Sequence, residues 1–95
     1  MAVTQPDISV SPYQYTDIYL AQKVPAGTRG VLQNKSVIPM YVQIGIPGKP
    51  PAKDSMAGSY VQPYEYLELR PDPGETIFVK SIGNRATVSL QVRSY

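Results

Sequence analysis

The chain contains 95 residues, the length of a single small domain, and its nine basic and seven acidic residues give a net charge of +2. So small an excess of charge does not indicate a nucleic-acid-binding surface. The sequence has no histidine and no cysteine, which excludes disulfides, thiol chemistry and histidine-based catalysis or metal binding, and we expect no cofactor.

The N-terminal residues, 1–12, contain two prolines, several small polar residues and few large apolar ones. This composition favours an extended N-terminal arm, followed by a single domain over residues 13–95. The first residues also lack a basic segment followed by an apolar core, and no apolar run is long enough to cross a bilayer. We therefore expect a protein that is made in the cytoplasm and does not contact a membrane.

The segment from Tyr13 to Val24 has no proline or glycine and carries several tyrosine and aliphatic residues. A helix would place Tyr15, Ile18 and Tyr19 on one face, whereas a strand would separate Ile18 from Tyr19. We predict a strand, because tyrosine and isoleucine favour pleated structure and the rest of the chain has the periodicity of β-structure.

Strict alternation of apolar side chains indicates two further strands, one starting at Met40 and one around Val88. With the turn residues between apolar segments, the predicted strands are 13–24, 29–34, 40–46, 59–62, 64–70, 76–81 and 86–93. We expect strands 29–34 and 40–46 to form one hairpin, and the last two strands to form another. Six to seven short strands predict an all-β fold, a small antiparallel β-sandwich of jelly-roll or immunoglobulin-like type.

The segment 47–58 contains three prolines and two glycines, and it is predicted to be a long loop because prolines cannot donate to a β-ladder. Loops of this length are often functional. With Lys49, Lys53 and Met56 it would make a contact arm for a partner. The alternative is a tolerated surface insertion.

Tyrosine is the dominant aromatic residue, with eight copies against one phenylalanine. A domain of this size buries only about 60–65% of its unfolded surface, so it cannot bury all of them, and assembly would stabilise it. Tyrosine is enriched at protein interfaces, although partly exposed tyrosines on a sheet face need no function. The residues predicted to form a protein interface are Pro6, Tyr13, Tyr15, Lys49, Lys53, Met56, Tyr60, Tyr64 and Tyr66.

Four carboxylates, Glu65, Glu68, Asp72 and Glu75, lie close together in the sequence and raise the question of a glycosidase pair. Glu65 and Glu68 are three residues apart, so a strand would point them to opposite faces, and nothing in the sequence indicates a cleft. The segment 72–75 also offers too few ligands for calcium. We predict no catalytic residues, no metal site and no enzyme activity.

Two parts of the chain resemble small β-domains of tailed-bacteriophage virion proteins. One is the C-terminal part, with the Pro-Asp-Pro-Gly-Glu turn of residues 71–75 before the closing strands, and the other is the Asn-Lys-Ser turn of 34–36 that leads through Pro39 into Tyr41-Val42. The resemblance implies a structural protein of the virion, such as a capsid decoration (cement) protein or a head or tail accessory protein.

Such a protein would be located in the virion and would bind the major capsid protein or another virion protein. It is expected to self-associate, with a trimer favoured, and to contact no nucleic acid. The alternative is a carbohydrate-binding or receptor-binding module of a tail fibre, in which Tyr60, Tyr64 and Tyr66 would stack on sugar rings.

Overall fold

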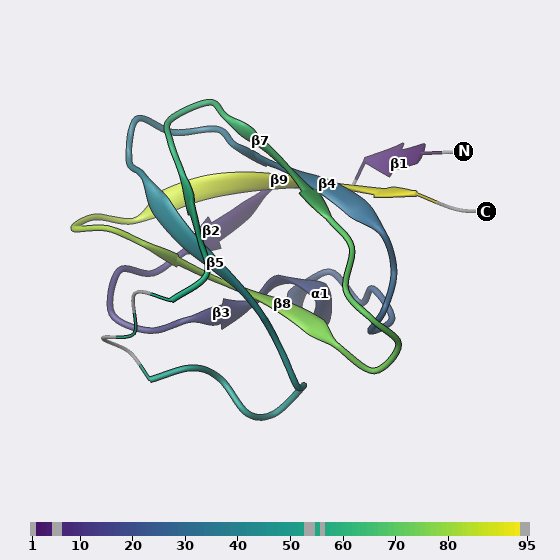
Figure 1. Cartoon of the computed structure of the whole chain (residues 1–95). Coiled ribbons are helices and arrows are strands. Elements are labelled where there is room, and N and C mark those ends of the chain that lie inside the picture. Colours follow the sequence, from purple (N-terminus) through teal and green to yellow (C-terminus); the bar gives the residue numbers. More distant parts are fainter. Residues whose placement is uncertain (1, 5–6, 53–54, 56, 94–95) are drawn as a thin grey trace.

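The computed structural model describes residues 2–4, 7–52, 55 and 57–93, and the side chains of 7–52, 55 and 57–92. They form two antiparallel sheets packed face to face (Figure 1), which confirms the predicted all-β sandwich. The five-stranded sheet contains β1 (Ala2–Thr4), β2 (Ile8–Val10), β4 (Gly30–Asn34), β7 (Tyr66–Leu69) and β9 (Ala86–Arg93). The four-stranded sheet contains β3 (Thr16–Asp17), β5 (Met40–Gly45), β6 (Ser59–Val61) and β8 (Thr76–Ser81).

The strands pair as a rolled antiparallel ribbon. β2 pairs with β9, β3 with β8, β4 with β7 and β5 with β6, so each strand in the first half of the chain has its partner in the second half. Rolling this ribbon places β1, β2, β4, β7 and β9 in one sheet, with order β1-β9-β4-β7 and β2 also paired with β9, and β3, β5, β6 and β8 in the other, with order β3-β8-β5-β6. Of the two predicted sandwich types, this pairing is the jelly roll.

The two predicted hairpins are wrong for the same reason. Residues 29–34 and 40–46 correspond to β4 and β5, which lie in different sheets, and β8 and β9 are also in different sheets. Each connection crosses from one sheet to the other instead of joining neighbours. The alternation of apolar residues indicates which face of a strand is buried, but it does not indicate which strand lies beside it.

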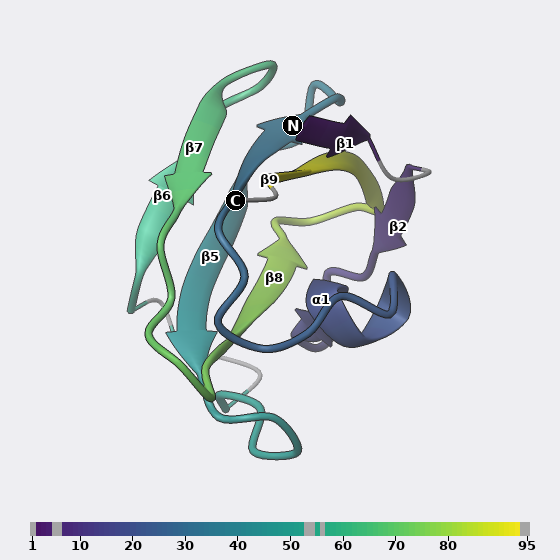
Figure 2. The same cartoon turned by 90° about the vertical axis from the view of Figure 1, so that its right-hand side faces the viewer.

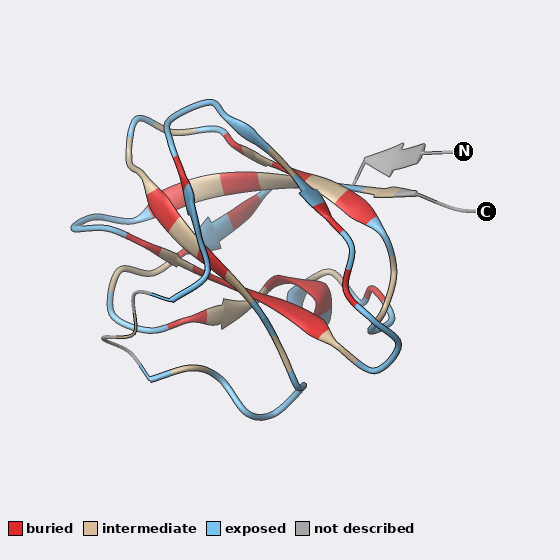
Figure 3. Ribbon diagram, viewed as in Figure 1, coloured by how far each residue is buried: buried red, intermediate tan, exposed pale blue. Residues whose placement is uncertain are grey.

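The core lies between the inner faces of the two sheets, as the alternation of buried and exposed residues in Figure 3 shows. Leu32 pairs with Leu90 in one sheet and Val42 pairs with Val79 in the other, and all four side chains are buried. β6 pairs only with residues 40–42 of β5, so the second half of β5 is at the edge of its sheet. Ile44 is about half exposed there, although it continues the predicted apolar face.

The N-terminal segment is extended, as predicted, but it is paired along β9 rather than separate from the domain. β1 aligns Ala2 with Arg93, and β2 aligns Ile8 with Val88. Val10 is fully buried in the core, and Ile8 is nearly so. Within the segment 1–12 that was predicted as an arm, β2 thus completes the edge of the five-stranded sheet.

The predicted strand over 13–24 is wrong beyond its first part, because Thr16–Asp17 forms the short strand β3 and a helix, α1 (Ile18–Ala21), follows. Asp17 is the N-cap of α1, and its side chain accepts a hydrogen bond from the Leu20 N–H at 3.0 Å. Ile18 and Tyr19 are buried in the core, as the helical alternative required, whereas Tyr15 precedes α1 and is buried outside the core cluster. Among the described residues no helix has the length and hydrophobicity to span a membrane.

Candidate interaction surface

Four loops meet at one end of the sandwich, and we call this the loop end. They are the connections 11–15, 35–39, 62–65 and 82–85, which follow β2, β4, β6 and β8. Figure 1 shows them together at the side of the molecule opposite the N and C labels. The antiparallel pairing of the rolled ribbon requires this arrangement, because these four strands all end in the same direction.

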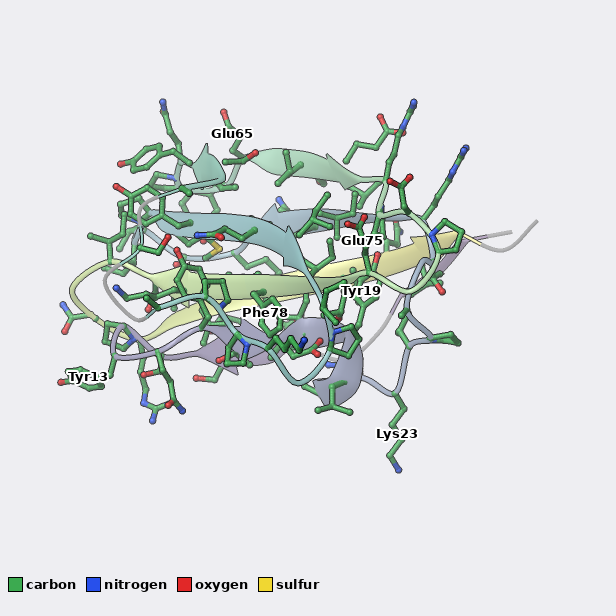
Figure 4. The ribbon with its side chains drawn as sticks, turned by 60° about the horizontal axis from the view of Figure 1, so that its bottom comes forward. Tyr13, Tyr19, Lys23, Glu65, Glu75 and Phe78 are labelled. Carbon is green, nitrogen blue, oxygen red and sulfur yellow. The ribbon has the colours of Figure 1, made fainter. Side chains whose placement is uncertain are left out.

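Each of these loops exposes one large apolar side chain. Tyr13 is 77% exposed, Val37 68%, Tyr64 57% and Ile82 36%. Figure 4 shows Tyr13 projecting away from the sheets at this end, whereas the labelled Tyr19 and Lys23 lie toward the other end. Single exposed apolar residues are ordinary, but a group gathered at one end of a small domain is typical of an interaction site.

Asn34 fixes two of the four loops. Its buried side chain donates from Nδ2 to the carbonyl of Ile38 at 2.7 Å and to that of Gln62 at 3.3 Å. Its Oδ1 accepts from the backbone N–H and the hydroxyl of Ser36, at 3.0 and 2.9 Å. The amide therefore holds the loop that carries Val37 beside the loop that carries Tyr64.

Backbone hydrogen bonds connect the remaining loops. The N–H of Ile82 donates to the carbonyl of Pro39 at 3.0 Å, and the N–H of Ser81 donates to the carbonyl of Ser11 at 3.2 Å. The Ser81 hydroxyl also donates to the carbonyl of Val10 at 3.3 Å. The loop end is consequently a connected framework, and a surface that is already ordered loses less conformational entropy when it binds a partner.

Tyr64 has a backbone conformation that is unusual for a side chain of its size, with φ at 62°. The turn around it is closed by the Glu65 N–H, which donates to the Gln62 carbonyl at 3.1 Å, and by the Gln62 N–H, which donates to Glu65 Oε1 at 3.2 Å. Left-handed conformations of non-glycine residues cluster at binding sites. Here the conformation holds the Tyr64 ring in solvent at the loop end.

The structure places the predicted interface residues in several different regions. Tyr13 and Tyr64 belong to the loop end, and Tyr60 and Tyr66 lie on strands next to it. Lys49 is exposed in the turn after β5, toward the other end of the sandwich. Pro6, Lys53 and Met56 lie outside the described residues. No signal in the sequence distinguished Val37 and Ile82, which are single apolar residues within otherwise polar turns.

Tyr15 was predicted to lie at an interface, but it is only 6% exposed. Its hydroxyl donates to the carbonyl of Ser55 at 2.6 Å and accepts from Gln43 Nε2 at 3.1 Å, and the same Nε2 donates to the Ser55 hydroxyl at 2.9 Å. These bonds attach the loop 47–58 to the outer face of the four-stranded sheet at Ser55. Tyr15 thus anchors that loop within the chain.

The three tyrosines proposed to stack on sugars do not share one flat face. Tyr60 is on the outer face of the four-stranded sheet, where its ring meets that of Tyr41 edge to face, with centroids 5.7 Å apart. Tyr66 lies on the outer face of the other sheet. It is on β7 of the five-stranded sheet, where the buried Leu69 faces inward and Tyr66, three residues before it, faces outward. Figure 2 shows β6 and β7 along one side of the sandwich and α1 along the other.

Three of the four carboxylates considered for catalysis have local structural partners. Glu65 closes the turn at Gln62, Glu68 forms an ion pair with Arg70 at 2.7 Å, and Glu75 Oε1 accepts from the Asp72 N–H at 2.8 Å. Within residues 7–52, 55 and 57–92, no group of three or more acidic side chains is placed to hold a metal ion.

Comparison with protein families, with curated proteins and with solved structures finds no match to this chain. The class of protein that the fold defines is therefore a small all-β jelly-roll sandwich, and its function has to be argued from the surface.

Proposed function

We propose that this protein is a structural component of a tailed-phage virion, a decoration (cement) protein that binds the major capsid protein or another virion protein through the loop end. The observation that carries the proposal is the group of four exposed apolar side chains, one on each of four loops that hydrogen bonds hold in place. Aromatic anchors on an ordered surface are characteristic of protein-binding sites.

Two further features support a binding role. The jelly roll occurs in viral capsid proteins as well as in lectins, an analogy that concerns the fold alone. The tyrosines that a sugar platform would need are divided between the outer faces of two sheets, which favours the protein-binding alternative. A domain of this size also gains stability from assembly, and we propose that it associates with copies of itself, as a trimer.

The first experiment asks whether the protein is in the particle. Mass spectrometry of density-purified particles of the phage whose genome encodes this chain should detect it at a fixed copy number relative to the major capsid protein. Sedimentation equilibrium of the purified protein should give the mass of three chains. Absence from purified particles would overturn the proposal.

The second experiment tests the loop end. Particles that lack the protein are incubated with purified variants, and the bound protein is measured after sedimentation. Replacing Tyr13 and Val37 with serine should weaken binding at least tenfold, because exposed anchors carry most of the affinity. The matched control replaces Ile44 and Ile46, which are about half exposed at the far end of β5, away from the loop end, and should bind as the wild type does. Equal loss in both variants would remove the loop end from the proposal.

A further inference from the structure

A cavity of about 180 Å³ lies at the side of the sandwich away from the loop end, between α1 and the turn after β5. Its walls are mostly apolar, and Leu20, which is three-quarters exposed, lines it. The residues around it are Asp17, Tyr19, Leu20, Val24, Ala26, Pro47, Gly48 and Thr76. Pockets for drug-sized ligands begin at about 300 Å³, so this one suits a single side chain or a similarly small molecule.

Asp17 is the ionisable carboxylate of this cavity, and its two oxygens have different surroundings. Oδ1 accepts from the Leu20 N–H at 3.0 Å and from the Thr76 hydroxyl at 2.5 Å. Within the described residues Oδ2 accepts no hydrogen bond. The carboxylate is thus held in position by one oxygen, and the other oxygen retains its capacity to accept from a ligand.

Besides Asp17 and Thr76, the remaining polar side chain of the wall is Tyr19, and it does not donate to Oδ2. The Tyr19 hydroxyl donates to the carbonyl of Thr28 at 2.5 Å, so its proton is already used. What the cavity offers is one anionic acceptor beside aliphatic walls. This combination fits an amphipathic cation, with methylenes against Leu20 and Val24 and an ammonium at Asp17.

Two lysines near the cavity in the sequence do not supply the ammonium group that would pair with Asp17. Lys23 follows α1 and Lys49 follows Gly48, and both side chains are exposed. Neither forms an ion pair with Asp17. Their repulsion of a bound ammonium is screened by salt, since both are solvated.

We propose that this cavity binds one alkylammonium group, supplied by a lysine side chain of a partner protein. The chemistry of the cavity follows from its own walls. That the partner is a virion protein rests on the proposed function, and failure of particle binding would leave the alkylammonium site intact.

The test is an NMR titration of the purified protein with n-butylammonium and, separately, with the neutral n-butanol. Butylammonium should shift the Leu20 amide and the Val24 and Ala26 methyl signals in a saturable way, and butanol should bind at least tenfold more weakly. A short peptide with one central lysine should shift the same signals, and the same peptide with acetylated lysine should not. Equal affinity for butanol, or no saturable shift, would overturn the proposal.

The control variant is Asp17→Asn. Asparagine caps a helix as well as aspartate does, so α1 should be retained, while an NH₂ group replaces the oxygen that accepts the ammonium. This variant should keep the wild-type spectrum elsewhere and lose the preference for butylammonium over butanol. If the preference persists in Asp17→Asn, the carboxylate is not the recognition group. If butylammonium binds but neither peptide does, the ammonium group is not supplied by a lysine side chain of a protein, and that part of the proposal fails.

Discussion

The side-chain amide of Asn34 donates to the carbonyl of Gln62, 28 residues further along the chain, across 3.3 Å. Asn34 ends a strand of the five-stranded sheet, and Gln62 follows a strand of the four-stranded sheet. A single buried side chain therefore joins two loops of the loop end across the sandwich.

We expect Asn34→Ala to destabilise the protein by about 2–3 kcal/mol, because buried backbone groups would lose their partners. Ser36→Ala, which removes only a hydroxyl of the same network, should cost about 1 kcal/mol. Urea unfolding followed by tyrosine fluorescence measures both values. Equal stabilities of the two variants would show that the Asn34 amide does not hold the loops together.

The position of β2 gives a second prediction. Val10→Ala should destabilise the protein by about 2 kcal/mol, because Val10 is fully buried and truncation leaves a cavity. Ser9→Ala, on the exposed face of the same strand, should change stability by less than about 0.5 kcal/mol. Thermal or urea unfolding compares them. A Val10→Ala variant as stable as the wild type would restore the separate N-terminal arm.

This N-terminal segment illustrates what the sequence can and cannot predict. The strands 76–81 and 86–93 were predicted with the bounds that β8 and β9 have, because turn residues mark their ends and 86–93 displays the period of two over eight residues. β2 has only Ile8 and Val10 around one serine, too short a pattern to distinguish from an extended arm. The helix α1 was considered but a strand was predicted in its place, because four residues are too few to establish a helical period, and the cap at Asp17 was the further signal.

The candidate site was less predictable than the fold. Tyr13 and Tyr64 could be selected from composition, since so many tyrosines cannot all be buried. Val37 and Ile82 become part of a surface only because the rolled ribbon brings their loops to the same end. Pairing between distant strands decides this arrangement, and local periodicity does not contain that information.

Alanine substitutions at Gly58 and Gly48 distinguish the cost of a steric clash from the cost of backbone strain. Gly58 has φ at 95°, and a Cβ there would lie 2.3 Å from the carbonyl oxygen of Val42, whereas Gly48 has φ at 81° with no atom within 4 Å. Gly48→Ala should cost about 1 kcal/mol from conformation alone, and Gly58→Ala about 2 kcal/mol more. The comparison is made by urea unfolding. Equal costs would show that β5 and the start of β6 can move apart.

Tyr19 predicts how stability changes in alkaline solution. Its side chain is 1% exposed, and burial raises the pKa of Tyr19 from 10.0 to about 12. The folded state therefore favours the neutral phenol more than the unfolded state does. The neutral Tyr19 phenol therefore contributes about 2–3 kcal/mol to the free energy of unfolding. This contribution is fully present below pH 10 and is lost as the pH rises through 12.

The variant Tyr19→Phe has no proton to lose at this position, and the other tyrosines are common to both proteins. Near pH 8 it should be less stable than the wild type by about 1 kcal/mol, because the Thr28 carbonyl loses its hydrogen bond. As the pH approaches 12 the wild type should lose stability faster, so the order of the two proteins reverses. Urea unfolding at several pH values tests this. Parallel curves for the two proteins would mean that Tyr19 ionises as easily folded as unfolded.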